Sequence, residues 1–114
     1  VVTGVQTCAL PIYFVQGHVD TTAAVKKINL VGKSLQINFK FSKKFKKYLV
    51  QKGSITINGV SLTIAKILVD GLQIVIIPQT LKLTNLIHLK EKDVVNIEFD
   101  VLGKYIKKFL KWAK

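Results

Sequence analysis

The stretch from Gly53 to Ile64 constrains the fold of this chain more than any other part of its sequence. It places Asn58-Gly59 between two runs in which apolar residues alternate with polar ones. Asn-Gly in such a position favours a type I′ turn, which joins two antiparallel strands in a tight hairpin. Because strand side chains alternate between faces, Ser61 and Thr63 lie opposite the apolar residues of the second strand. Two neighbouring hydroxyls can hold a polar ligand or simply meet solvent, as threonines on strand faces commonly do.

Strand patterns of the same kind run through most of the chain. They are expected over residues 13–19 and 23–31, with a break at 20–22, and then over 34–41, 55–58, 60–68, 72–77 and 93–101. Two short helical segments interrupt them, one capped by Ser42 and running to Val50, and one over Gln79–Leu86 after Pro78 has ended a strand. We predict an all-β fold, a six-stranded antiparallel Greek-key barrel with short helical insertions, since closure removes the exposed edges of so apolar a sequence.

The periodicity changes at the C-terminus. From residue 102 to residue 114, apolar residues recur at spacings of three and four and lysines fill most other positions, which predicts an amphipathic helix. We therefore divide the chain into a barrel, 13–101, and this helix, 102–114. The apolar stripe of the helix can fold back on the barrel, lie on a membrane surface or associate with other copies. Its residues are Leu102, Tyr105, Ile106, Phe109, Leu110 and Ala113.

Charge and length limit the functions that the chain can have. It has 114 residues and a formal charge of +12, and all 18 of its basic residues are lysine. This length suits one small domain with its own core. A basic oligonucleotide-binding barrel is the alternative from another class of proteins. Arginine, the usual residue for sequence readout, is absent, so we expect no nucleic acid partner. No apolar run is long enough to span a membrane, and we expect no membrane partner.

Residues 1–12 do not match the pattern of the rest and look like a translated sequencing adapter, so we exclude them from the native domain. They contain the only cysteine, Cys8. The remaining chain then has neither a disulfide framework nor a thiolate metal site, which suits a cytoplasmic protein. His18 and Asp20 share a strand face, but no third ligand lies at a suitable spacing, and we expect no metal.

Three motifs in a fixed order give the chain a specific likeness. They are Tyr13–Ala23, Gly53–Ile64 and Ile76–Leu86, accompanied by Lys52-Gly53 and the expected strand Val94–Glu98. Together they resemble the second lumazine-binding barrel of riboflavin synthase. That enzyme needs no cofactor and converts two molecules of 6,7-dimethyl-8-ribityllumazine into riboflavin and 5-amino-6-(ribitylamino)uracil. The resemblance implies that this barrel binds one lumazine and that the chain itself uses no cofactor.

The resemblance also implies which residues bind the substrate. They are Gly17, His18, Val19, Lys52, Ser61, Leu62, Thr63, Val75, Ile76, Ile77, Pro78, Gln79 and Thr80. Ser61, Thr63 and Thr80 would supply hydroxyls for the ribityl chain of the ligand. Ile76 and Ile77 would form an apolar wall for its ring.

His18 is the candidate catalytic residue, either as a proton carrier oriented by Asp20 or simply as a ligand contact. In the family, catalysis brings together two lumazines, one held by the first barrel of a subunit and one by the second barrel of a neighbour in a homotrimer. No first barrel precedes Tyr13 here, so we expect a fragment of the enzyme that is inactive alone. The C-terminal helix resembles the one through which the family's subunits trimerise. A non-catalytic lumazine-binding or flavin-binding protein is the alternative within the same fold.

Overall fold

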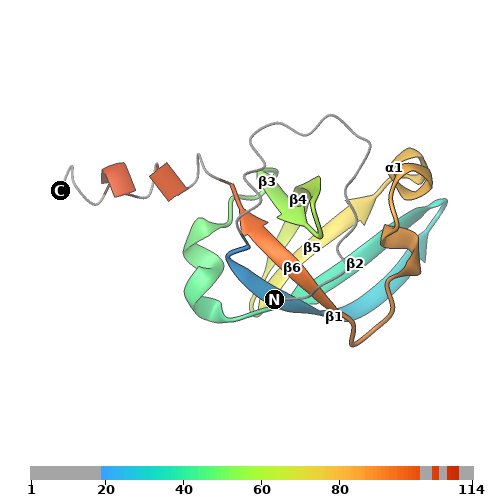
Figure 1. The fold of residues 1–114 in the computed structure, drawn as a ribbon, viewed down its shortest axis with the longest axis horizontal. Helices are drawn as coiled ribbons and strands as arrows, with labels where there is room; N and C mark the ends of the chain where they lie inside the picture. The colour runs from blue at the N-terminus through green and yellow to red at the C-terminus, as the bar shows by residue number, and fades with distance from the viewer. Residues whose placement is uncertain (1–18, 101–103, 106–107, 111–114) are drawn as a thin grey trace.

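Residues 19–100, 104–105 and 108–110 are described by the computed structural model, and they contain a closed barrel of antiparallel strands (Figure 1). The strands are β1 (Thr21–Val31), β2 (Ser34–Lys40), β3 (Ser54–Ile57), β4 (Val60–Leu68), β5 (Gly71–Ile76) and β6 (Val94–Phe99). Their order around the barrel is β1-β2-β5-β4-β3-β6. Strands β3, β4 and β5 follow one another as hairpins and β6 returns beside β3, which is the Greek-key connection. The predicted fold class is confirmed.

The Asn58-Gly59 hairpin forms as predicted. Both turn residues have positive φ, 49° and 81°, and Ile57 and Val60 on either side of them pair as neighbours. The turn is also fastened to a third strand. The Asn58 amide donates to the Asn96 carbonyl at 2.9 Å, and the Asn58 Oδ1 atom accepts from the Asn96 amide at 2.8 Å. The turn residue therefore holds the hairpin against β6.

Some predicted strand boundaries were wrong. The expected break at 20–22 does not extend to Thr21 and Thr22, because both belong to β1 and pair with Ile97 and Asn96 of β6. The register also shifts once within β1 and once within β4, between Ile64 and Lys66. Such bulges insert an extra residue and bend the strand, which helps a short sheet to close on itself.

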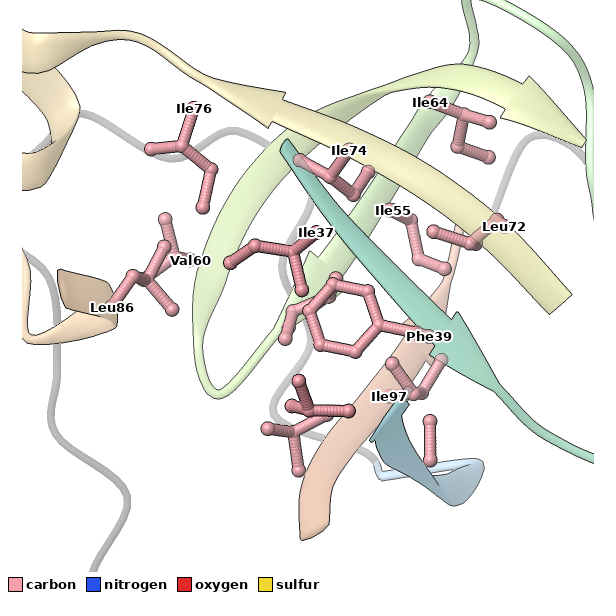
Figure 2. Packing of buried hydrophobic residues seen from close by; sticks show 14 of the residues in the cluster. Ile37, Phe39, Ile55, Val60, Ile64, Leu72, Ile74, Ile76, Leu86 and Ile97 are labelled. Carbon is pink, nitrogen blue, oxygen red and sulfur yellow. The ribbon is translucent and has the colours of Figure 1, made fainter. Parts of the chain in front are cut away.

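Inward-facing side chains fill the barrel (Figure 2). Ile37 and Phe39 of β2 face Ile97 of β6 across the core, and all three have no measurable exposure. These residues alternate with polar neighbours along their strands, as the period-two pattern predicted. At about 25 cal/mol per Å² of apolar surface, burial of such side chains is the main stabilising contribution to the fold.

A short 3-10 helix, η1 (Lys43–Tyr48), covers one end of the barrel. It is shorter than the predicted helix, and Ser42 makes no capping hydrogen bond with its side chain, so that prediction was wrong. Aromatic contacts hold η1 in place instead. The rings of Phe45 and Tyr48 lie 5.3 and 5.4 Å from the ring of Phe99, a separation typical of favourable aromatic pairs.

Two helical turns, α1 (Pro78–Leu83) and η2 (Leu86–His88), lie at the other end (Figure 1). They confirm the predicted helical segment after Pro78, which stands at the first turn of α1, where its missing amide costs nothing. Leu81 and Leu86 bury their side chains in the core and so fasten both turns to the barrel.

The described residues of the C-terminal helix, 104–105 and 108–110, extend away from the barrel (Figure 1). Tyr105, Phe109 and Leu110 are 65%, 69% and 56% exposed. The interpretation that the apolar stripe folds back on its own barrel is therefore wrong for these three residues. The rest of the stripe, the expected strand from residue 13 and the adapter-like residues 1–12 lie outside the described part. Within that part, no helix is long and apolar enough to cross a membrane.

Candidate functional site

The two strands that carry most of the predicted site part from each other halfway along. Pairing between β4 and β5 extends from Leu68 and Gly71 to Ile64 and Ile74, and in the described residues it continues no further. Beyond that point, Ser61–Thr63 pair only with β3, and Val75 and Ile76 pair only with β2. One edge of each strand is thus left without a ladder partner at this place. Backbone N–H and C=O groups on such edges need partners and can bind the amide-like edge of a planar ring.

Hydroxyl groups gather on the outer face beside this divergence. Ser61 is half-buried and Thr63 is exposed, while their apolar neighbours Val60 and Ile64 are 1% exposed in the core. Across the hairpin, Thr56 pairs with Ser61, and Ser54 pairs with Thr63. Directly opposed strand residues have Cβ atoms about 5 Å apart, so the four side chains are neighbours. Thr56 is 8% exposed, so the hydroxyls open to a ligand are those of Ser54, Ser61 and Thr63.

Sequence analysis missed two of these four residues. Ser54 and Thr56 alternate with Ile55 and Ile57 before the turn, in the same way that Ser61 alternates with its neighbours after it, although Thr56 is itself buried. The alternation of polar and apolar residues before the turn could therefore have identified Ser54 and Thr56. Only the hairpin register shows that the hydroxyls of both strands share one face and stand opposite each other.

The apolar side of the site differs from the expectation. Ile76 was expected to help wall the ring, but its side chain is 1% exposed and packs in the core (Figure 2). It can offer only backbone atoms to a ligand. Val75 and Ile77, which flank it, are 44% and 53% exposed and can supply apolar surface. Leu62 is partly buried against the core.

The remaining predicted residues lie at the two borders of this region. Pro78, Gln79 and Thr80 form the first turn of α1, directly after β5, and Thr80 is half-buried. Lys52 is exposed, and its backbone adopts a left-handed φ of 67°. The Lys52 amide donates to the Ile64 carbonyl at 2.8 Å, which fixes the lysine backbone beside the strand that carries Ser61 and Thr63.

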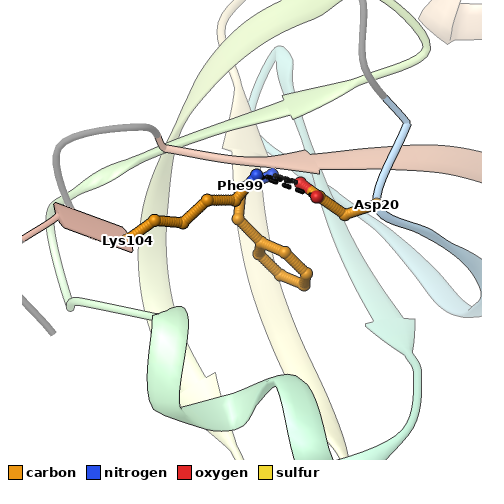
Figure 3. Close-up of polar contacts among 3 residues, drawn as sticks. All are labelled: Asp20, Phe99 and Lys104. Atoms are coloured by element: carbon orange, nitrogen blue, oxygen red, sulfur yellow. Dashed lines mark hydrogen bonds and ion pairs between the residues drawn. The ribbon is translucent and has the colours of Figure 1, made fainter. Parts of the chain in front are cut away.

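Gly17 and His18 lie outside the described residues, and Val19 is 38% exposed at the edge of the described part. The proposed partner of His18 is engaged elsewhere (Figure 3). One Asp20 oxygen accepts from the Phe99 amide at 2.8 Å, and the Lys104 ammonium lies 2.8 Å from both oxygens. The contacts of Asp20 are thus with β6 and the C-terminal helix. Among the described residues, no group of three acidic, histidine or cysteine side chains could hold a metal.

The described residues thus form a closed Greek-key barrel with hydroxyls and an apolar surface beside unpaired strand edges. Residues 16–100 match the sequence profile of the lumazine binding domain, which accounts for most of the chain. The chain belongs to the lumazine-binding domain family.

Known relatives agree with this family. Riboflavin synthase of Actinobacillus pleuropneumoniae is 41% identical over 98 residues, which cover 86% of this chain and 46% of that enzyme. Riboflavin synthase of Bacillus subtilis shows the same identity and the same coverage. The chain therefore spans about half the length of these curated relatives.

Solved structures show the same fold. LumP complexed with 6,7-dimethyl-8-(1'-D-ribityl) lumazine superposes with a TM-score of 0.69 at 29% identity, over 73% of this chain and 47% of that one. LumP complexed with flavin mononucleotide superposes over the same shares, with a TM-score of 0.68.

Proposed function

We propose that this chain is the second lumazine-binding barrel of a riboflavin synthase and that it binds one molecule of 6,7-dimethyl-8-ribityllumazine. The divergence of β4 from β5 beside the accessible hydroxyls of Ser54, Ser61 and Thr63 is the observation that carries the proposal. The pyrimidinedione edge of a lumazine offers carbonyl acceptors and an N–H donor, which complement unpaired strand backbone. Its ribityl chain offers hydroxyls, which match those of Ser61 and Thr63.

The described positions suggest how the ligand is held. The backbone of Ile76 and Leu62 would bind the ring edge, and the exposed side chains of Val75 and Ile77 would cover the ring. Lys52, anchored through its amide to β4, would reach the ribityl chain or a ring carbonyl. Pro78, Gln79 and Thr80 would border the site from α1, and Gly17, His18 and Val19 would complete it.

The reaction itself needs a second lumazine. A dismutation transfers a four-carbon unit between two substrates, and holding both in register replaces an improbable encounter in solution. This barrel supplies one of the two sites, so we expect the chain alone to bind substrate without turning it over. With its partner barrel it would act as a transferase, and His18 would contact the ligand or carry a proton. We place this activity in the cytoplasm.

Self-association would proceed through the C-terminal helix. Tyr105 and Phe109 are four residues apart, the spacing of one face of an α-helix, and both are exposed to solvent, as is Leu110. Exposed aromatic and aliphatic side chains on one helix are typical of a surface that packs against another copy. We propose a homotrimer, and sedimentation equilibrium of the wild-type chain measures its mass directly.

A non-catalytic lumazine or flavin carrier is the second candidate. The structures of LumP with a lumazine and with flavin mononucleotide favour it, since they share this fold at 29% identity. The higher identity to riboflavin synthases, 41%, favours the enzyme. Mixing this chain with a separately expressed first barrel decides between them, because only the enzyme would then form riboflavin.

The binding proposal is tested by a fluorescence titration with 6,7-dimethyl-8-ribityllumazine in the presence of excess single-stranded oligonucleotide. Thr63→Val removes one hydroxyl and keeps the β-branched shape, so it should weaken binding by about fivefold to tenfold, the loss of one hydrogen bond. Thr22→Val, the matched control, removes a strand hydroxyl from β1, which is not adjacent to β4 or β5 in the barrel. We expect the control to bind like wild type.

Equal affinity of wild type and Thr63→Val would refute the proposed site. Binding that the oligonucleotide abolishes would instead favour the basic oligonucleotide-binding barrel, for which salt-sensitive affinity is the characteristic signature.

A further inference from the structure

The Asp20 carboxylate joins the start of β1 to two neighbouring segments much later in the chain, the end of β6 and the C-terminal helix (Figure 3). It follows Val19 directly, it accepts a hydrogen bond from the Phe99 amide at the end of β6, and it pairs with Lys104 of the C-terminal helix. Asp20 and Lys104 are 84 residues apart. We call this ion pair the latch.

The latch is better placed to hold structure than an ordinary surface ion pair. Its side chains are 23% and 32% exposed, its N–O distance is 2.8 Å, and the carboxylate is held in place by the Phe99 amide. A second ion pair, Lys26–Asp70, has a distance of 3.1 Å and a lysine that is 54% exposed. Charge-assisted bonds that are short and shielded contribute more than solvated ones.

The latch ties the start of the C-terminal helix, at Lys104, to the barrel. The Lys104 amide donates to the Asp100 carbonyl at 3.2 Å, so Lys104 stands in the turn that begins the helix. Adjacent helical residues point about 100° apart, so a helix held by the Lys104 side chain presents Tyr105 and Phe109 to one side of the contact. Both of these side chains are exposed.

The latch also fixes the start of β1. The Asp20 amide donates to the Ile97 carbonyl at 2.9 Å, while the Asp20 side chain holds Phe99 and Lys104. Main chain and side chain of Asp20 are thus both engaged. Val19, the neighbouring residue and a member of the proposed ligand site, cannot shift far without disturbing these contacts.

We infer that Asp20 is a positioning residue that couples the ligand site at Val19 to the self-association helix through Lys104. The inference rests on the proposed function, because it joins the proposed ligand site to the proposed association surface. Coupling of this kind is reciprocal: a ligand that orders the start of β1 favours the docked helix, and an associated helix favours ligand binding.

Three variants test the inference. Asp20→Asn keeps an oxygen for the Phe99 amide but loses the ion pair, Lys104→Met removes the other partner, and Lys104→Arg restores the charge. Each is compared with Asp70→Asn, which breaks the Lys26–Asp70 ion pair. The readouts are lumazine affinity, the association constant from sedimentation equilibrium, and the fluorescence anisotropy of Trp112, the only tryptophan of the chain.

We expect Asp20→Asn and Lys104→Met each to weaken lumazine binding and self-association by about fivefold to tenfold, as loss of one shielded charge-assisted bond implies. Trp112 should become more mobile in both variants. The double variant should lose no more than either single one, because both break the same contact. Lys104→Arg should recover most of the loss, and Asp70→Asn should behave like wild type.

Wild-type lumazine affinity and wild-type association in both latch variants would overturn the inference and leave the proposed function standing. A wild-type chain that binds no lumazine or does not associate would overturn the proposed function. In that case Trp112 anisotropy still tests the latch, since unchanged mobility in both variants would refute it. Should Asp20→Asn fail to fold, Lys104→Met decides alone, because it leaves every contact within the barrel intact.

Discussion

Gly71 is the position at which the structure predicts the largest effect of a minimal change. A Cβ atom added there would overlap the Phe39 carbonyl oxygen, and it would lie 2.8 Å from the Phe39 carbonyl carbon and 3.1 Å from the Lys40 Cα atom. All three are backbone atoms of β2, so no side chain can rotate away. Gly71→Ala must therefore push β5 away from β2 where Lys40 pairs with Gly71 and Phe39 pairs with Leu72.

The cost follows from the contacts that this displacement breaks. Two or three backbone hydrogen bonds are worth about 1 kcal/mol each, and forced repacking of a filled core adds about 1–3 kcal/mol. Phe39 and Leu72 both have no measurable exposure, so neither can relax into solvent. We expect Gly71→Ala to lower the free energy of unfolding by about 3–6 kcal/mol, a large part of the stability of a small domain.

Urea unfolding followed by circular dichroism measures this loss. The control is Gly32→Ala, because Gly32 has a φ of 62° and an added Cβ there would meet nothing within 4 Å. It isolates the cost of a left-handed alanine, about 1–2 kcal/mol. A Gly71→Ala variant within about 1 kcal/mol of this control would refute the argument, since it would mean that β2 and β5 separate easily.

Two further predictions concern single contacts. Asn58→Gly keeps the left-handed turn but removes the acceptor for the Asn96 amide, so it should lower the free energy of unfolding by about 1–3 kcal/mol. Asn58→Asp keeps an acceptor and should lose less in the same urea titration; an equal loss would refute the role of this bond. The hydrogen bond from Lys26 lowers the pKa of Asp70 below its ordinary value of 3.8. The ion pair between Lys26 and Asp70 therefore contributes to stability above pH 3.8, and this contribution is lost as the pH falls through the lowered pKa. In Asp70→Asn, the free energy of unfolding should therefore fall less steeply with decreasing pH in that range.

The local features of the fold could be predicted from sequence because they depend on neighbouring residues. Asn58-Gly59 specifies its turn through two residues with positive φ, and Pro78 ends its strand because it has no amide to donate. The alternation that buries Ile37 and Phe39 is also local. Local patterns fail where contacts with distant residues decide the structure. Ser42 makes no side-chain capping hydrogen bond, and η1 is held instead by aromatic packing against Phe99.

The candidate site divides in the same way. The hydroxyl face of Ser61 and Thr63 follows from period two, and the opposing hydroxyls of Ser54 and Thr56 follow only from the hairpin register. The burial of Ile76 also follows from period two, because Leu72, Ile74 and Ile76 share the strand face opposite Gln73, and the expected ring contact overlooked this alternation.

By itself, the sequence determined which segments are strands, where the tight turns lie, and which family the motifs resemble, because turn chemistry and side-chain alternation act over a few residues. The tertiary structure alone decided where β4 leaves β5, which residues of β3 stand opposite Ser61 and Thr63, and that Asp20 meets Lys104. These features depend on pairing between strands and on contacts across many tens of residues. Such contacts form only when the whole barrel closes, and no local pattern encodes them.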